Sequence, residues 1–188
     1  MEHIFKNELK IEPAEHNVLL TEASTNPKSQ REKMVKIMFE TFNLPGLWVA
    51  ESANLSLFSV GQLTGLVCES GEGVTQCVPV LDGYVLSQGI NKMYFAGRDI
   101  TDLLIKLLNK AGYPLKTNAE REIARDIKEK LCYVSRDFEE RKKNYMKRRY
   151  KMPNNSLIIV KDQSFGAPEI LFHPEMCGRE RRYCSKML

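Results

Sequence analysis

The chain has 188 residues, of which 43% are hydrophobic and 28% charged, and its formal net charge at pH 7 is +4. This length allows one sizeable core, and the composition is that of a globular protein rather than a disordered or membrane protein. No apolar run approaches the roughly 20 residues that cross a bilayer, so we expect no membrane span. The first residues, Met1–Lys6, do not look like a secretory signal.

The positive charge is concentrated in residues 141–151, which contain seven basic residues and no acidic one. A run of this kind is usually a solvated face. The alternative is a weak polyanion contact, with nucleic acid or acidic lipid, because Tyr145 and Tyr150 lie among the cations.

The five cysteines are odd in number and show no CxxC spacing. They fall mostly inside apolar runs, and this pattern favours buried, reduced thiols in an intracellular compartment over disulfides or a zinc site. The three histidines are scattered and indicate no metal site.

The N-terminal third predicts helices and short strands in alternation. Residues 1–17 predict a helix and a polar turn around Pro13, and residues 17–21 a strand. Asn26 and Pro27 are typical of an N-cap and a first helical turn. The helix that follows should present one apolar face, formed by Met34, Ile37, Met38 and Thr41. Residues 47–50 predict a buried strand, and residues 53–60 a short helix closed by Gly61.

Residues 66–80 predict a β-hairpin. An apolar run ends at Glu69, the segment Ser70–Gly73 reverses the chain, and a second run begins at Val74. Glycine at alternate positions permits positive φ and lets the backbone approach a ligand. Successive N–H groups in such a turn suit an anion such as phosphate. On this stretch alone, the alternative is an ordinary hairpin with a flexible tip.

The second half of the chain predicts two amphipathic helices. A strand at 83–86 precedes a helix from Ile100 to Ala111, with Asp99 at its start and Gly112 after its end. Thr117 and Glu120 have the spacing of a capping box for the next helix. Residues 157–160 predict another strand, and residues 168–172 begin a further element.

Many colinear segments of the chain resemble the actin family, from about Met1 to Glu180. They include residues 20–23, 26–27, 31–34, 37–43, 70–75, 96–99, 119–123 and 126–134. The resemblance implies an α/β, actin-like ATPase fold, present in part, of the kind shared by sugar kinases, Hsp70 chaperones and actin (RNase H-like). In that fold a nucleotide lies between two halves.

The resemblance also implies a division of the chain. Residues 1–59 match the later part of the base of the first half, and residues 60–95 the base of the second half with its phosphate hairpin. Residues 96–188 match the upper part of the second half, with the tail 181–188 unassigned. The family's first phosphate hairpin and its adenosine-binding segment have no counterpart, so we expect an internal fragment or a truncated form.

By the same resemblance, the chain carries residues that bind ATP or ADP with Mg²⁺. The turn should hold the phosphates through Ser70, Gly71, Glu72, Gly73 and Val74. Gly97 and Arg98 match a pair near the ribose, and Arg125, Lys128 and Glu129 match residues that flank adenine and ribose. From the residues alone, Lys128 and Glu129 are solvated helix charges. No direct metal ligand is expected, although Glu69 is placed to reach Mg²⁺ through water.

The family's catalytic positions are substituted in this chain. Ser52 stands where the family has a glutamine, Glu69 and Glu72 where it has aspartates, and Gln76 where it has a histidine. An extra methylene displaces a carboxylate by about 1.5 Å, which is large when catalysis depends on placement. We therefore predict weak or absent ATP hydrolysis, and the alternative is tolerated drift.

These observations favour an actin-like or actin-related protein of the cytoskeleton, in the cytoplasm or nucleus. Its expected partners are actin or other cytoskeletal proteins, with the nucleotide as a structural ligand. Two alternatives stay open: a non-nucleotide interaction module derived from actin, and a polymerising ATPase. The sequence leaves open whether the chain is an enzyme.

Overall fold

A computed structural model describes residues 1–178 and divides the chain into two units. The first unit contains Met1–Cys68 and Cys77–Ile90, and the second contains Glu69–Gln76 and the chain from Asn91 onward. The tail at 181–188 lies outside the described residues. The division of the chain at 59/60 and 95/96 stays a prediction.

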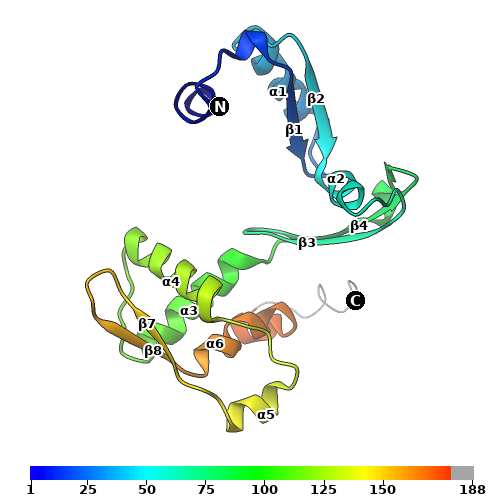
Figure 1. The fold of residues 1–188 in the computed structure, drawn as a ribbon. Helices are drawn as coiled ribbons and strands as arrows, with labels where there is room; N and C mark the ends of the chain where they lie inside the picture. Colours follow the sequence, from blue (N-terminus) through cyan, green and yellow to red (C-terminus); the bar gives the residue numbers. More distant parts are fainter. Residues whose placement is uncertain (179–188) are drawn as a thin grey trace. The chain divides into compact units, whose positions relative to one another are not determined.

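The first unit contains a parallel β–α–β arrangement. Strands β1 (Val18–Glu22) and β2 (Leu47–Glu51) pair in parallel, and helix α1 (Lys28–Glu40) connects them (Figure 1). Both strands were predicted, but β2 is not buried throughout, because Trp48 is 70% exposed. A sheet of two strands offers a large aromatic ring little surface to pack on. Before β1, the predicted N-terminal helix is present as a π-helix (Ile4–Leu9), and the predicted turn around Pro13 is a 3-10 turn (Pro13–Glu15).

Helix α1 begins one residue later than its sequence predicts. Pro27 immediately precedes the helix, and the Asn26 side chain donates to the Glu22 carboxylate at 2.8 Å instead of capping α1. The N-cap prediction is therefore wrong. The predicted apolar face is buried at Met38, whereas Ile37 is half exposed.

A second core in this unit lies between α2 (Ser52–Ser59) and the predicted hairpin, formed by β3 (Gly65–Ser70) and β4 (Thr75–Leu81). Its sheet has the order β3-β4-β5, with β5 at Tyr84–Val85. A 3-10 turn follows at Ser87–Gly89. The buried core residues are Ala53, Leu57, Val67, Val78 and Val80. Gly61, with a φ of +72°, ends the α2 segment as predicted.

The second unit is built on two amphipathic helices that pack against each other, α3 (Gly97–Lys110) and α4 (Asn118–Leu131) (Figure 1). A short strand, β6 (Asn91–Met93), precedes α3 and pairs with β4, whose first two residues belong to this unit. The antiparallel pair β7 (Arg148–Lys151) and β8 (Leu157–Val160) completes the core with α6 (Gln163–Gly166) and 3-10 turns at Pro168–Leu171 and Pro174–Cys177. The fully buried residues include Leu104, Leu108, Ile127, Val160 and Ile170.

Local hydrogen bonds explain why both helices start where they do. The hydroxyl of Thr117 accepts from the Glu120 amide at 3.2 Å, and the Glu120 carboxylate accepts from the Thr117 amide at 2.8 Å. This arrangement confirms the predicted capping box. At α3, the Asp99 carboxylate accepts from the Ala96 amide at 3.1 Å.

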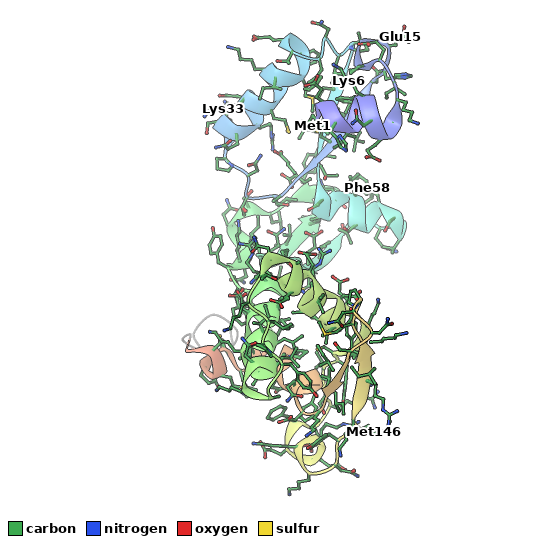
Figure 2. The ribbon with its side chains drawn as sticks, turned by 90° about the vertical axis from the view of Figure 1, so that its left-hand side faces the viewer. Met1, Lys6, Glu15, Lys33, Phe58 and Met146 are labelled. Atoms are coloured by element: carbon green, nitrogen blue, oxygen red, sulfur yellow. The ribbon has the colours of Figure 1, made fainter. Side chains whose placement is uncertain are left out.

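The segment between α4 and β8 is rich in charged residues. Helix α5 (Phe138–Lys143) is followed by a loop in which Met146 is 72% exposed (Figure 2). Of the helices in residues 1–178, none combines the length and the apolar character needed to cross a bilayer.

Candidate phosphate-binding turn

The tip of the β3–β4 hairpin is a tight turn closed by main-chain and side-chain hydrogen bonds. The Gly71 amide donates to the Val74 carbonyl at 3.0 Å, and the hydroxyls of Ser70 and Thr75 lie 2.8 Å apart across the strands. Thr75 also donates to the Phe95 carbonyl at 2.7 Å. Its hydroxyl thus holds the tip to the segment before α3, a role that no local sequence pattern indicates.

The two glycines of the turn are not required by the conformation or packing of the described chain. Neither Gly71 nor Gly73 is among the glycines with positive φ, so the expectation of positive φ at these positions is wrong. A β-carbon at Gly73 would meet no atom within 4 Å, and one at Gly71 would meet only the Val74 carbonyl, at 3.9 Å. The missing side chains therefore leave open space on the turn.

The same turn leaves two successive amides without a backbone acceptor. Within residues 1–178, the N–H groups of Glu72 and Gly73 donate to no backbone carbonyl. Unpaired neighbouring N–H groups at an exposed turn are suited to an anion. The turn therefore has neighbouring amides that suit an anion, which is the feature that singled it out in the sequence, although Gly71 and Gly73 do not have positive φ.

The start of α3 is fastened to the turn through the main chain. The Gly97 amide donates to the Gly71 carbonyl at 3.0 Å, and the Arg98 amide donates to the Glu72 carbonyl at 2.7 Å. A β-carbon at Gly97 would lie 3.0 Å from the Gly71 oxygen. A side chain at this position would therefore force the neighbouring atoms to shift. The first two amides of α3 are used to hold the turn, so the amides that could bind an anion are those of the turn itself.

Three side chains of α4 were predicted to contact the nucleotide. Of these, Lys128 is the one whose contacts lie at the turn. Its ammonium donates to the Gly97 carbonyl at 3.0 Å and lies 3.8 Å from the Glu72 carboxylate. The Lys128 side chain is 15% exposed, and that of Glu72 is 53% exposed. On the sequence alone Lys128 could be a solvated surface charge. In the structure it is a largely buried cation beside the turn.

Arg125 and Glu129 lie on the exposed surface of α4. The Arg125 guanidinium contacts the Glu122 carboxylate at 3.1 Å and the Glu129 carboxylate at 3.9 Å. Exposed pairs of this kind contribute little stability, about 0–1 kcal/mol. Since the Arg125 and Glu129 side chains are both exposed, a ligand can reach them. Arg98, at the start of α3, is also exposed.

Two of the substituted catalytic positions contact each other below the turn. The Gln76 amide nitrogen donates to the Glu69 carboxylate at 3.1 Å. Gln76 is only 5% exposed, and its side-chain oxygen is buried without a hydrogen-bond donor among the described residues. A buried acceptor without a donor costs about 1–3 kcal/mol. Ser52, another substituted catalytic position, is the first residue of α2 and belongs to the first unit.

Acidic residues near the turn do not form a metal site by themselves. Within residues 1–178 there is no cluster of three or more His, Cys, Asp or Glu side chains that could hold a metal ion. Glu69 and Glu72 are single carboxylates on the two sides of Ser70 and Gly71. They could accept hydrogen bonds from the water shell of a cation that is itself bound to phosphate.

An ion pair between α3 and α4 has no signal in the sequence pattern. The Arg121 guanidinium donates to the Asp102 carboxylate, and this hydrogen bond raises the pKa of Arg121. The pair lies 19 residues apart in sequence, so no local motif predicts it. It joins the two helices that carry Gly97 and Lys128.

The basic stretch 141–151 spans the end of α5, the following loop and strand β7. Two of its arginines contact the face of the Tyr133 ring, with guanidinium-to-centroid distances of 5.7 Å for Arg141 and 4.7 Å for Arg148. Arg148 also donates to the Leu131 carbonyl at 3.1 Å. These two cations are thus engaged within the fold, and contact of the stretch with a polyanion stays a prediction.

Comparison with known proteins supports the resemblance read from the sequence. A protein-family model described as Actin matches residues 1–187 of the chain. The match covers nearly all of the 188 residues, including the hairpin, α3 and α4. The mixed α/β architecture described above agrees with a partial fold of that type.

Proposed function

Because the chain belongs to the actin family, we propose that it is an actin-like cytoskeletal protein that binds the phosphates of ATP or ADP at the β3–β4 turn. Hydrolysis of ATP is slow or absent. The single observation that carries the proposal is the open turn at Gly71 and Gly73. Within residues 1–178, the amides of Glu72 and Gly73 donate to no backbone carbonyl, the missing side chains leave space, and Lys128 places a positive charge beside the turn.

The residues around the turn fit the phosphate end of a nucleotide with Mg²⁺. Ser70–Val74 supply amides and a hydroxyl, and Lys128 supplies the cation. When bound, Mg²⁺ would neutralise phosphate charge. Glu69 would accept from its water shell. The buried Gln76 oxygen has no hydrogen-bond donor among the described residues, and such a water could supply one. Gly97, Arg98, Arg125 and Glu129 are the candidates for the ribose and base.

Slow hydrolysis follows from the residues at the catalytic positions. A glutamine at position 52 could orient an attacking water, whereas the Ser52 hydroxyl is shorter by about two heavy atoms and has less reach. Glu69 carries its carboxylate one methylene further than aspartate, and it is already hydrogen-bonded to Gln76 at 3.1 Å. We expect binding to be retained better than chemistry, because the amides of the turn do not depend on these side chains.

The test is a titration of the whole chain with a fluorescent ATP analogue, displaced by ATP, ADP or adenosine. ATP and ADP should compete, and adenosine should compete much more weakly, because the proposed contacts are with phosphate. Gly73→Val should abolish competition by filling the open space. Gly166→Ala, where a β-carbon also meets no atom within 4 Å, is the matched control and should bind as the unaltered chain does.

The partners proposed are actin or other cytoskeletal proteins, in the cytoplasm or nucleus. Co-sedimentation with actin filaments tests this part separately from the nucleotide. Co-sedimentation without any nucleotide binding would replace the proposal with an interaction module. Magnesium-ATP-dependent pelleting of the chain alone would replace it with a polymerising ATPase.

A further inference from the structure

Two cysteines face each other across the hairpin just below the turn. The Sγ atoms of Cys68, on β3, and Cys77, on β4, lie 2.8 Å apart, and neither residue is in a disulfide. The cysteines are separated by residues 69–76, so the sequence gives no CxxC signal. The fold alone brings them together.

The register of the hairpin places the two cysteines directly opposite each other. Gly71 bonds to Val74, and the contacts of Ser70 with Thr75 and of Glu69 with Gln76 step one residue along each strand. The next opposed pair is Cys68 and Cys77. Hydrogen-bonded and non-hydrogen-bonded pairs alternate in an antiparallel ladder, so a bonded pair at the turn makes the cysteines a non-hydrogen-bonded pair.

That pair type has the geometry of a disulfide. Its Cα atoms are typically about 4.5 Å apart, within the range of about 4.4–6.8 Å that disulfides span. A bond between the two sulfurs therefore requires little movement of the backbone.

The two thiols differ in access to solvent. Cys68 is exposed, whereas Cys77 is 8% exposed. Burial, with a further contribution from the hydrogen bond to Cys68, raises the pKa of Cys77 to about 11. Because a thiolate is the reactive form, an oxidant in solution meets Cys68 first, and Cys77 reacts second.

We propose that Cys68 and Cys77 form a redox-sensitive thiol pair that hydrogen peroxide oxidises to a cross-strand disulfide. The Cys68 thiolate attacks the peroxide bond, giving a sulfenic acid and releasing hydroxide, which takes up the thiol's proton as water. The Cys77 sulfur then attacks the sulfenic sulfur, and a second water leaves. Two thiols and one peroxide thus give one disulfide and two waters. This proposal does not depend on nucleotide binding.

The consequence for the hairpin is local. Cys68 and Cys77 are the residues on either strand next to the segment Glu69–Gln76, which contains the whole turn. A disulfide at this position closes that segment into a short covalent loop. It restrains the turn that carries Glu69, Glu72 and Gln76, and reduction by a thiol releases it.

The test is a thiol map of the full native chain before and after exposure to hydrogen peroxide. After quenching, the protein is denatured, alkylated and digested with trypsin. Residues 37–92 contain no Lys or Arg before Lys92, and their two cysteines are Cys68 and Cys77. The peptide should carry two alkyl groups before oxidation and none after it. The mass of the oxidised peptide should be two hydrogens lower than that of the reduced peptide without alkyl groups. Reduction should restore both groups. Cleavage after glutamate, at Glu69 and Glu72, should leave two peptides joined by the disulfide.

Single variants test the order of attack. With Cys77→Ser, Cys68 should be trapped as a sulfenic acid that a dimedone probe labels. With Cys68→Ser, Cys77 should stay reduced at the same peroxide dose. Cys132, whose burial raises its pKa to about 12, is the internal control in the same digest and should keep its alkyl group.

Two results would overturn the proposal. The first is a peptide 37–92 that keeps both thiols at a peroxide dose that oxidises Cys132. The second is oxidation of this peptide only to sulfenic or sulfinic acid without a link between its cysteines. Neither result depends on whether a variant folds, because both are read from the unaltered chain.

Discussion

The ammonium group of Lys128, on α4, lies 3.8 Å from the Glu72 carboxylate at the tip of the hairpin. The cation therefore already has a negative partner, and an arriving phosphate would compete with Glu72 for it. Since Glu72 is 53% exposed, its carboxylate can turn toward water at small cost. Glu72 thus gives the Lys128 ammonium a partner, while the positive charge stays beside the turn.

Replacing Lys128 with glutamine should weaken ATP binding at least about tenfold, because a hydrogen bond to a charged group contributes about 1.5–3 kcal/mol. The measurement is the competition titration with ATP. Lys130→Gln is the matched control, since Lys130 pairs with Asp126 at 2.8 Å on the exposed side of the same helix. Equal losses in both variants would contradict a specific role for Lys128.

Gly97→Ala should destabilise the second unit, because its β-carbon would lie 3.0 Å from the Gly71 oxygen and 3.2 Å from the Lys128 ammonium. Overpacking of this kind costs about 1–3 kcal/mol. Gly73→Ala should change stability by less than about 0.5 kcal/mol, since no atom lies within 4 Å of the added carbon. Urea unfolding followed by circular dichroism measures both. A larger loss at Gly73 than at Gly97 would refute the packing argument.

The capping box of α4 predicts a pH-dependent contribution to stability. Hydrogen bonds from the backbone amides of Lys116 and Thr117 lower the pKa of Glu120 below its usual 4.5. An acid with a lowered pKa stabilises the fold above its unfolded-state pKa, and this contribution is lost as pH falls through the folded-state value. The stability difference between the unaltered chain and Glu120→Gln should therefore be present at pH 7 and shrink below pH 4.5. Thermal melts at several pH values measure it, and a difference that grows on acidification would contradict the assignment.

Restoring the family's residues at the catalytic positions should raise ATP turnover. The unaltered chain should show no magnesium-dependent phosphate release above background. The triple variant Ser52→Gln, Glu69→Asp, Gln76→His should release phosphate faster if these substitutions are what slows the chemistry. The control is the same triple variant with Gly73→Val, which should return to background. Turnover in the unaltered chain that Glu69→Ala abolishes would overturn the prediction of weak hydrolysis.

The basic stretch predicts which cations bind a polyanion. Arg141 and Arg148 are held against Tyr133, whereas Lys143 and Lys147 are exposed and should contribute to any binding. Replacing these two with glutamine should weaken binding to single-stranded nucleic acid. It should also make the plot of log affinity against log salt concentration less steep, by about 0.7 for each phosphate that the protein no longer neutralises. Binding that does not change with salt would rule out a polyanion site on this stretch.

The local parts of the fold could be predicted from the sequence. The hairpin at 66–80, the helix after Asp99 and the capping box at Thr117 depend on neighbouring residues, whose types decide the conformation. Asn26 shows where such reasoning fails, because its side chain had a competing partner in Glu22. Trp48 shows a second limit, since an apolar run does not reveal whether another element covers it.

The contacts that make the candidate site were not readable from local pattern. Lys128 meets Gly97 across 31 residues, and only the packing of α3 on α4 brings them together. The glycine-rich turn was recognised as a candidate anion site but with the wrong backbone conformation. Within residues 1–178, its Glu72 and Gly73 amides donate to no backbone carbonyl, and no composition signal describes this.

The turn is attached to α3 through the peptide groups of Gly71, Glu72, Gly97 and Arg98. Replacing a side chain at positions 69, 72 or 76 leaves these groups in place. Reactive residues on this hairpin can therefore be exchanged during evolution while the scaffold that presents them persists. A chain of this design can lose an activity and keep the shape that once supported it.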